Sequence, residues 1–142
     1  MKALHGHRGF TLIDLVVVIT ILGILAAFAV PRFVALESEA REAATEALSG
    51  SVRAAASLAH AQWLAQGSTG TVDMEGQTIT MVNGYPNLVT IDNALADLSG
   101  FTYNDTTGVF STTGATGTCT VTYAQAASAG DAPSIAIDVS GC

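Results

Sequence analysis

Asp14 is the residue of this sequence whose position most demands a chemical explanation. It lies inside an apolar stretch from Phe10 to Val30, where an ionised side chain is costly and usually has a partner. If the chain is cleaved before Phe10, the new α-amino group lies one helical turn from Asp14 on the same face. The amine and the carboxylate can then neutralise each other, within one molecule or between two. The alternative is a solvated Asp14 at the edge of the apolar stretch.

The two cysteines, Cys119 and Cys142, are the second feature with possible chemistry. If this part of the chain lies outside the cytoplasm, the compartment permits a disulfide that ties Cys142 back onto the fold. A closed loop of about 24 residues predicts a stabilisation of roughly 3 kcal/mol. The alternative is a pair of unpaired buried thiols. A zinc site needs more cysteine or histidine than the sequence has nearby.

No set of residues points to catalysis, a cofactor or a metal. His60 is a single histidine in an alanine-rich segment, which is typical of a surface or boundary residue rather than a base. The scattered aspartates do not form a D-x-[DN]-x-[DN]-G calcium loop. Asn104-Asp105-Thr106 matches a glycosylation sequon, a pattern that is common by chance. A signal-anchored enzyme therefore lacks a candidate nucleophile, base or cofactor loop, and we expect no enzymatic activity.

The charge balance excludes a nucleic-acid partner. The chain of 142 residues has room for one domain and carries a formal net charge of −7. Nucleic-acid surfaces need clustered lysine or arginine. Beyond residue 9 the basic residues are three arginines, against twelve acidic residues, which is a net charge of −9.

The apolar stretch is long enough to cross a membrane. Leu15 to Val30 contains one polar side chain, Thr20. A helix of the 21 residues from Phe10 to Val30 covers roughly 30 Å, the thickness of a bilayer core. No small-residue cleavage site follows the stretch, so we expect it to be retained. Lys2 and Arg8 precede it and predict a cytoplasmic N-terminus with the remainder outside.

The sequence pattern predicts one long helix followed by strands. We expect a bent helix from Phe10 to Gln66, weakened at Gly23, kinked at Pro31 and ended by Gln66-Gly67-Ser68. Its second half is amphipathic, and the spacing assigns the following residues to the buried face: Ala44, Leu48, Val52, Ala55, Ala59 and Trp63.

Residues 70–142 alternate between apolar runs and turn signals. We expect a hairpin around Glu75-Gly76, a turn at residues 83–86, and a short helix that Asp92 caps and that runs to Leu98 before Gly100. The remaining predicted strands are residues 101–103, 109–111, 118–123 and 134–140. The fold class is therefore α+β, a long N-terminal helix packed on a small antiparallel sheet domain.

The segment Arg8 to Ile19, with Gly23, Ile24, Leu25 and Pro31 downstream, resembles the N-terminus of type IV pilins and pseudopilins. The resemblance implies a leader of residues 1–9 that a prepilin peptidase removes after Gly9, and methylation of the new N-terminal Phe10. It also implies that Asp14 pairs with a neighbour's N-terminus during assembly, although the family nearly always has glutamate there. Residues 10–33 would form the transmembrane and fibre-core helix, and residues 34–142 a globular head, with an amphipathic helix at 34–66 and a β-region at 70–142.

The C-terminal half resembles a narrower group, the mannose-sensitive haemagglutinin pilins. The resemblance rests on residues 81–86, on Cys119 and on the ending from Asp138 to Cys142. It implies an attachment pilus whose subunit has a Cys119–Cys142 bridge. The subunit would be stored in the inner membrane of a Gram-negative bacterium and would then join a helical homo-oligomeric filament outside the cell. Its partners would be prepilin peptidase, the inner-membrane assembly machinery and, before assembly, the lipid bilayer. The alternative function is a pseudopilin of a type II secretion system.

Overall fold

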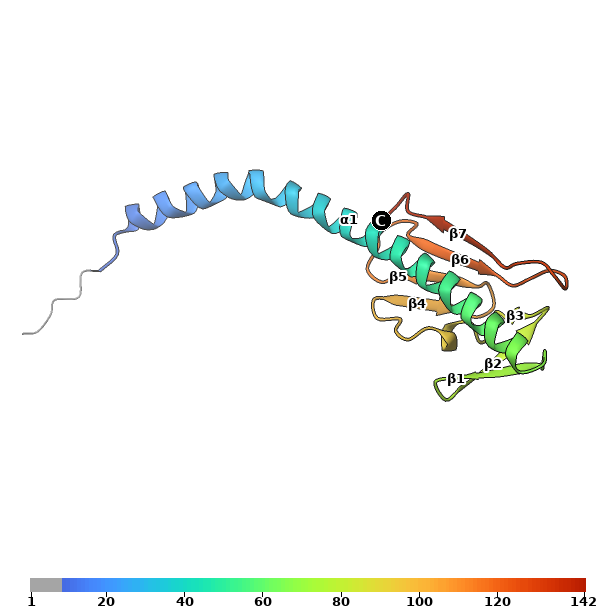
Figure 1. The fold of residues 1–142 in the computed structure, drawn as a ribbon. Helices are drawn as coiled ribbons and strands as arrows, with labels where there is room; N and C mark the ends of the chain where they lie inside the picture. The colour runs from blue at the N-terminus through green and yellow to red at the C-terminus, as the bar shows by residue number, and fades with distance from the viewer. Residues whose placement is uncertain (1–8) are drawn as a thin grey trace, which may run out of the picture. The chain divides into compact units, whose positions relative to one another are not determined.

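The computed structural model describes residues 9–142 and contains one long helix followed by short strands (Figure 1). Residues 1–8, which include Lys2, Arg8 and most of the predicted leader, lie outside the described residues. The chain divides into two compact units, one ending at Glu37 and the other running from Ser38 to Cys142. The elements are α1 (Leu12–Ala65), β1 (Thr71–Met74), β2 (Gln77–Val82), β3 (Tyr85–Pro86), the 3₁₀ turn η1 (Asp92–Ala94), β4 (Phe101–Asn104), β5 (Val109–Thr112), β6 (Thr120–Ala124) and β7 (Ser134–Asp138).

Helix α1 is a single helix of 54 residues with Pro31 inside it. It begins two residues after Phe10, because Thr11 occupies the position before the first turn, and it ends one residue before the predicted Gln66. The end is set by Gly67, which has a φ of 81° that a residue without a side chain adopts without strain. The amide of Ser68 then donates to the carbonyl of Trp63 at 2.9 Å.

The buried face of α1 differs in part from the predicted one. Ala44 is exposed and Trp63 is half-buried, whereas Thr45 and Ser49 are buried. The two hydroxyls can be buried because each donates to a helix carbonyl, Thr45 to that of Arg41 and Ser49 to that of Glu46. The complete buried set is Thr45, Leu48, Ser49, Val52, Ala55, Ala56 and Ala59.

The β-region forms two antiparallel sheets, with strand orders β1-β2-β3 and β4-β5-β6-β7. The predicted hairpin at Glu75-Gly76 is present, and Met74 pairs with Gln77. Asn83 and Gly84 form a second two-residue turn, with φ values of 54° and 88° that suit this type of hairpin. Tyr85–Pro86 is therefore a short strand that pairs with β2, and not part of the turn as predicted.

Two apolar clusters hold α1 on the sheets within the second unit. In the first, Leu48, Val52 and Ala56 lie in one cluster with Phe110 and Tyr123, together with Ile91 and Val121. In the second, Ala59 clusters with buried residues of the first hairpin: Val72, Met74, Ile79 and Met81. Figure 1 shows this part of α1 running across the strands. The helix and both sheets therefore depend on one another for burial.

The predicted helix from Asp92 to Leu98 is only the 3₁₀ turn η1, and its N-cap residue is Ile91 rather than the predicted Asp92. Ile91 is fully buried, and Leu95 turns to an extended conformation with a ψ of 135°. Leu95 and Leu98 then both pack against the first cluster. The extended path after Ala94 thus brings both leucines to the apolar surface of that cluster, which favours it over a regular helix.

Two strands of the second sheet are shorter than predicted. Strand β6 begins at Thr120 rather than Thr118, and β7 ends at Asp138 rather than Ser140. The carboxylate of Asp138 accepts a hydrogen bond from the amide of Ser140 at 3.0 Å, which turns the chain away from the sheet.

Candidate assembly segment and disulfide site

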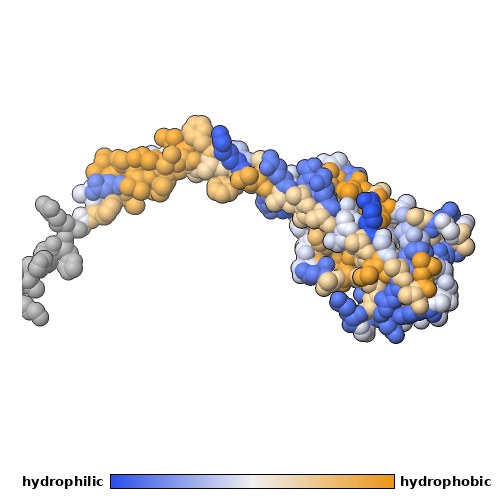
Figure 2. All heavy atoms as spheres, in the orientation of Figure 1, coloured by the Kyte–Doolittle hydropathy of each residue, from blue (hydrophilic) through white to orange (hydrophobic). Residues whose placement is uncertain are grey.

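The first half of α1 exposes apolar side chains on every side. Leu12 is 81% exposed and Phe28 is 74% exposed. The helix is long and apolar enough, by length and composition, to cross a membrane. Figure 2 shows this half covered by apolar residues. A surface of this kind needs lipid or protein to cover it.

Asp14 lies in the first turn of α1 and is bonded to Thr11. Its carboxylate accepts hydrogen bonds from the Thr11 amide at 3.1 Å and from the Thr11 hydroxyl at 2.5 Å. In return, the Asp14 amide donates to the Thr11 hydroxyl oxygen at 3.3 Å. This reciprocal arrangement is a capping box. It was missed in the sequence, where threonine followed three residues later by an acid, just before an apolar run, is its signal.

The capping box directs the Asp14 carboxylate toward the start of α1, where Gly9 and Phe10 precede the first turn. The predicted roles of Gly9 and Phe10 in cleavage and methylation stay predictions, as does the pairing of Asp14 with a neighbour's α-amino group. Gly23 and Pro31 both lie within α1 and are exposed. Their role as the kink of the helix also stays a prediction.

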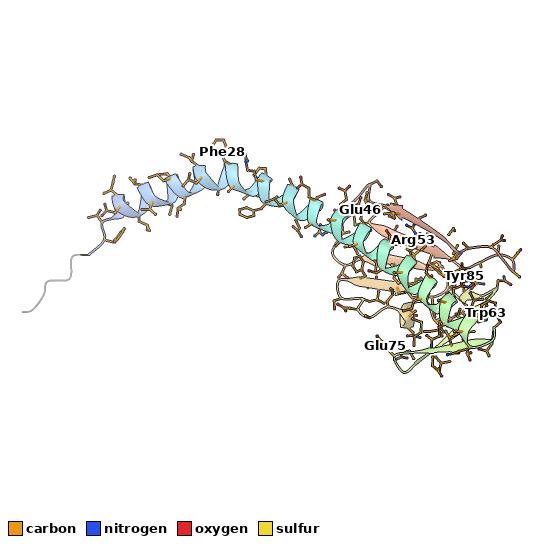
Figure 3. All side chains as sticks on the ribbon, viewed as in Figure 1. Phe28, Glu46, Arg53, Trp63, Glu75 and Tyr85 are labelled. Atoms are coloured by element: carbon orange, nitrogen blue, oxygen red, sulfur yellow. A yellow bond between two sulfur atoms is a disulfide. The ribbon has the colours of Figure 1, made fainter. Side chains whose placement is uncertain are left out.

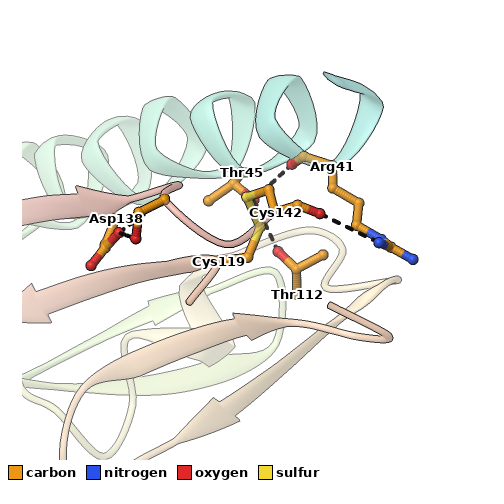
Figure 4. The surroundings of a disulfide bond; sticks show 7 residues. Arg41, Thr45, Thr112, Cys119, Asp138 and Cys142 are labelled. Atoms are coloured by element: carbon orange, nitrogen blue, oxygen red, sulfur yellow. Dashed lines mark hydrogen bonds between the residues drawn. A yellow bond between two sulfur atoms is a disulfide. The ribbon is translucent and has the colours of Figure 1, made fainter. Parts of the chain in front are cut away.

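The disulfide between Cys119 and Cys142 is confirmed, with the two Cα atoms 4.8 Å apart (Figure 4). Cys119 is buried, and its sulfur lies 3.2 Å from the hydroxyl of Thr45 on α1. That hydroxyl is also 2.9 Å from the hydroxyl of Thr112 at the end of β5. The bridge therefore lies between the helix and the second sheet, against buried polar groups that are all paired.

Two further contacts hold the segment around Cys142. An Nη of Arg41 donates to the Cys142 carbonyl at 3.4 Å. The amide of Gly141 donates to the Thr118 carbonyl at 2.7 Å, and a Cβ at Gly141 would lie 2.2 Å from the Thr118 nitrogen. Only glycine permits this approach of the two backbones. The last residues are thus attached to both α1 and the loop before β6.

Comparisons with known proteins agree with these features. Residues 4–30 match the family model "Prokaryotic N-terminal methylation motif", which covers Gly9, Phe10 and Asp14. Over 115 residues, 76% of this chain, the sequence is 32% identical to the type IV major fimbrial protein FimA of Dichelobacter nodosus. This chain is similar to type IV pilins.

Two other relatives match over shorter stretches. The type IV narrow pilus major component PilA5 of Thermus thermophilus is 51% identical over 55 residues, which are 39% of this chain and 47% of that protein. The type IV major pilin protein PilA of Myxococcus xanthus is 47% identical over 36 residues, 25% of this chain and 16% of that protein. The match to FimA covers 65% of FimA, so this chain spans less than two thirds of each of these relatives. No solved structure matches it.

His60 is a half-buried boundary residue. Its Nδ1 lies 2.6 Å from the Gly84 carbonyl, and its ring stacks on Tyr85 with centroids 4.3 Å apart. Trp63 also stacks with His60, at a centroid distance of 5.6 Å, and Figure 3 shows Trp63 and Tyr85 together near the end of α1. The set lines a hollow of about 520 Å³. Within residues 9–142, no group of three or more His, Cys, Asp or Glu side chains is placed to hold a metal ion.

Several other polar groups serve local structure. The Asn104 side chain of the sequon accepts from the amides of Thr106 and Thr107 and so forms a turn. Burial, followed by the nearby charges of Asp92 and Asp105, raises the pKa of the Tyr103 phenol to about 12. The Tyr103 hydroxyl donates to the Leu88 carbonyl. These groups stabilise the head, and their arrangement offers no reactive pair.

Proposed function

We propose that this chain is a type IV pilin, the major structural subunit of a type IV pilus, which polymerises through the first half of α1 into an extracellular fibre for surface attachment. The observation that carries the proposal is the all-round apolar exposure from Phe10 to Leu36 beside a head with its own buried core. Such a helix is stable in a bilayer or among copies of itself, and the relatives named above are major pilus or fimbrial proteins.

We propose a membrane-stored precursor with a cytoplasmic N-terminus. Prepilin peptidase removes residues 1–9 by cleaving after Gly9, and Phe10 becomes the methylated N-terminus. The inner-membrane assembly machinery of a Gram-negative bacterium then extracts the subunit into a helical filament of identical copies. The transfer exchanges lipid contacts of Phe10 to Val30 for contacts with other helices, so the apolar surface stays covered at each stage.

Asp14 acts in assembly by neutralising the α-amino group of a neighbour's Phe10. The capping box holds the carboxylate beside Thr11, at the end of the helix from which such an amine would approach. The globular heads of the subunits, each closed by the Cys119–Cys142 bridge, remain outside the core of the fibre. The narrower assignment to the mannose-sensitive haemagglutinin type of pilus is part of the same proposal.

Intact mass of the purified fibre subunit tests the processing. We expect the mass of residues 10–142 plus one methyl group and less two hydrogens for the disulfide. Gly9→Val should leave the leader attached and abolish fibres, while Gly6→Val within the leader is a matched control that should be processed normally. A subunit cleaved after Ala27 or Ala29 would contradict the proposal.

Electron microscopy tests the fibre itself. Cells labelled with an antibody to residues 70–142 should show long labelled fibres. Label confined to short periplasmic structures would instead point to the pseudopilin of a type II secretion system.

A further inference from the structure

An acidic groove lies on the head, between α1 and the first hairpin. Ser51, Ala54 and Leu58 of α1 form one wall, Met74 and Glu75 the second, and residues 93–97 the third. The groove has a volume of about 670 Å³. We call it the acidic groove.

The acidic groove combines an apolar floor with a charged rim. Leu58 is 60% exposed, although the adjoining Ala55 and Met74 are buried, so an apolar surface faces solvent here. Three carboxylates stand on the rim: Asp73, Glu75 and Asp97. No basic side chain lines the groove. A well-matched occupant is therefore apolar and carries a positive charge.

This chain contains such a segment, Arg32-Phe33-Val34. All three side chains are exposed on α1, with Phe33 70% and Val34 63% exposed. The positions one helical turn from Arg32 are Phe28, Ala29, Ala35 and Leu36, which offer it no counter-charge.

The other two arginines beyond residue 9 fit less well. Arg41 is bonded to the Cys142 carbonyl. Arg53 lies between Val52, which is buried, and Ala54, so no exposed large apolar side chain adjoins it. Only Arg32 joins a positive charge to exposed apolar side chains.

We propose that the acidic groove of one copy receives the Arg32-Phe33-Val34 segment of a second copy in the fibre. The proposal rests on the proposed function and names a contact between heads and helices beyond the N-terminal core. Before assembly, Arg32 at the outer end of the apolar stretch can extend to lipid headgroups. When the subunit leaves the bilayer that partner is lost, and the rim carboxylates replace it while Phe33 covers Leu58.

Cysteine cross-linking tests the contact in assembled fibres. Phe33 and Leu58 lie about seven turns apart on α1, so a disulfide between cysteines at these positions must join two chains. Fibres of the Phe33→Cys/Leu58→Cys variant should give, on mild oxidation, a ladder of multimers on non-reducing gels. The matched control is Phe33→Cys/Leu64→Cys, because Leu64 is 57% exposed on α1 but lies outside the groove. A ladder that is absent, or equally strong in the control, overturns the proposal.

Charge reversal tests the electrostatic part. Glu75→Arg should reduce the fibre yield by about two- to fivefold, the range expected from an exposed ion pair. Adding Arg32→Glu should restore the yield, since the pair is then reversed. Asp105→Arg is the matched control, an exposed acid in the β4–β5 turn outside the groove, and should have no effect. Failure of the reversal to restore the yield overturns the proposed pairing.

If the unmodified chain forms no fibres, the proposed function fails together with the groove contact. If fibres form but do not give the specific ladder of multimers, only the groove contact is overturned.

Discussion

Replacing Cys119 and Cys142 with serine removes the one covalent link between the end of the chain and its core. The bridge closes a loop with a sequence separation of 23 residues. In the chain-entropy model, opening a loop of this size costs about 3 kcal/mol of unfolding free energy. For a domain of about 100 residues this lowers the Tm by roughly 10–20 °C.

The surroundings of the bridge indicate that the cost of about 3 kcal/mol needs little correction. Cys119 is buried, but a serine hydroxyl there would lie near the hydroxyl of Thr45, with which it can form a hydrogen bond. The substitution therefore leaves no buried polar group without a partner, a loss that would add its own penalty. The expected cost is mainly that of the lost link.

Thermal unfolding of the full chain in detergent measures the effect, followed by near-ultraviolet circular dichroism of the head aromatics. Cys119→Ser alone and the double variant should give the same Tm, because either loses the bond, and the reduced unmodified chain should agree with both. A fall of less than about 3 °C would refute the entropic reasoning. The contacts of Arg41 and Gly141 would then be what holds the C-terminal segment.

Three further predictions concern assembly and pH. Asp14→Ala and Asp14→Asn should remain in the membrane but form few fibres per cell, because the neighbour's amine is left unpaired. Asp14→Glu should form fibres, and so should the control Thr11→Ala, which loses the cap and keeps the charge. A defect of Thr11→Ala as large as that of Asp14→Ala would assign Asp14 to capping alone. Fibres should dissociate in detergent more readily than in salt, since apolar burial outweighs screened charge in the core; sedimentation of treated fibres measures this, and dissociation by moderate salt alone would contradict it. Because the pKa of Tyr103 is raised from 10.0 to about 12 in the folded head, its contribution to stability is present below pH 10 and is lost as the pH rises toward 12. The stability of Tyr103→Phe should therefore be less sensitive to alkali between these pH values. An unchanged alkaline unfolding transition would show that another group governs it.

The N-terminal part of the chain was predictable because its signals are local. The apolar run from Phe10 to Val30 indicates a long helix, and glycine at position 67 marks its end. The hairpin at Glu75-Gly76 was predicted from alternation and turn residues that lie next to one another. In each case the deciding interactions join residues that are close in sequence.

The arrangement of the head was decided by contacts between distant residues. Whether Asp92 starts a helix depends on where Leu95 and Leu98 find an apolar surface, which α1 and β5 supply only after folding. The burial of Thr45 in place of Ala44 likewise follows from the bridge and Thr112 beside it. The acidic groove joins residues 51–62 to residues 73–75 and 93–97, and no spacing along the chain indicates it. Local propensity is a weak influence beside the burial of apolar area, and that burial is defined only when the helix and both sheets are packed together.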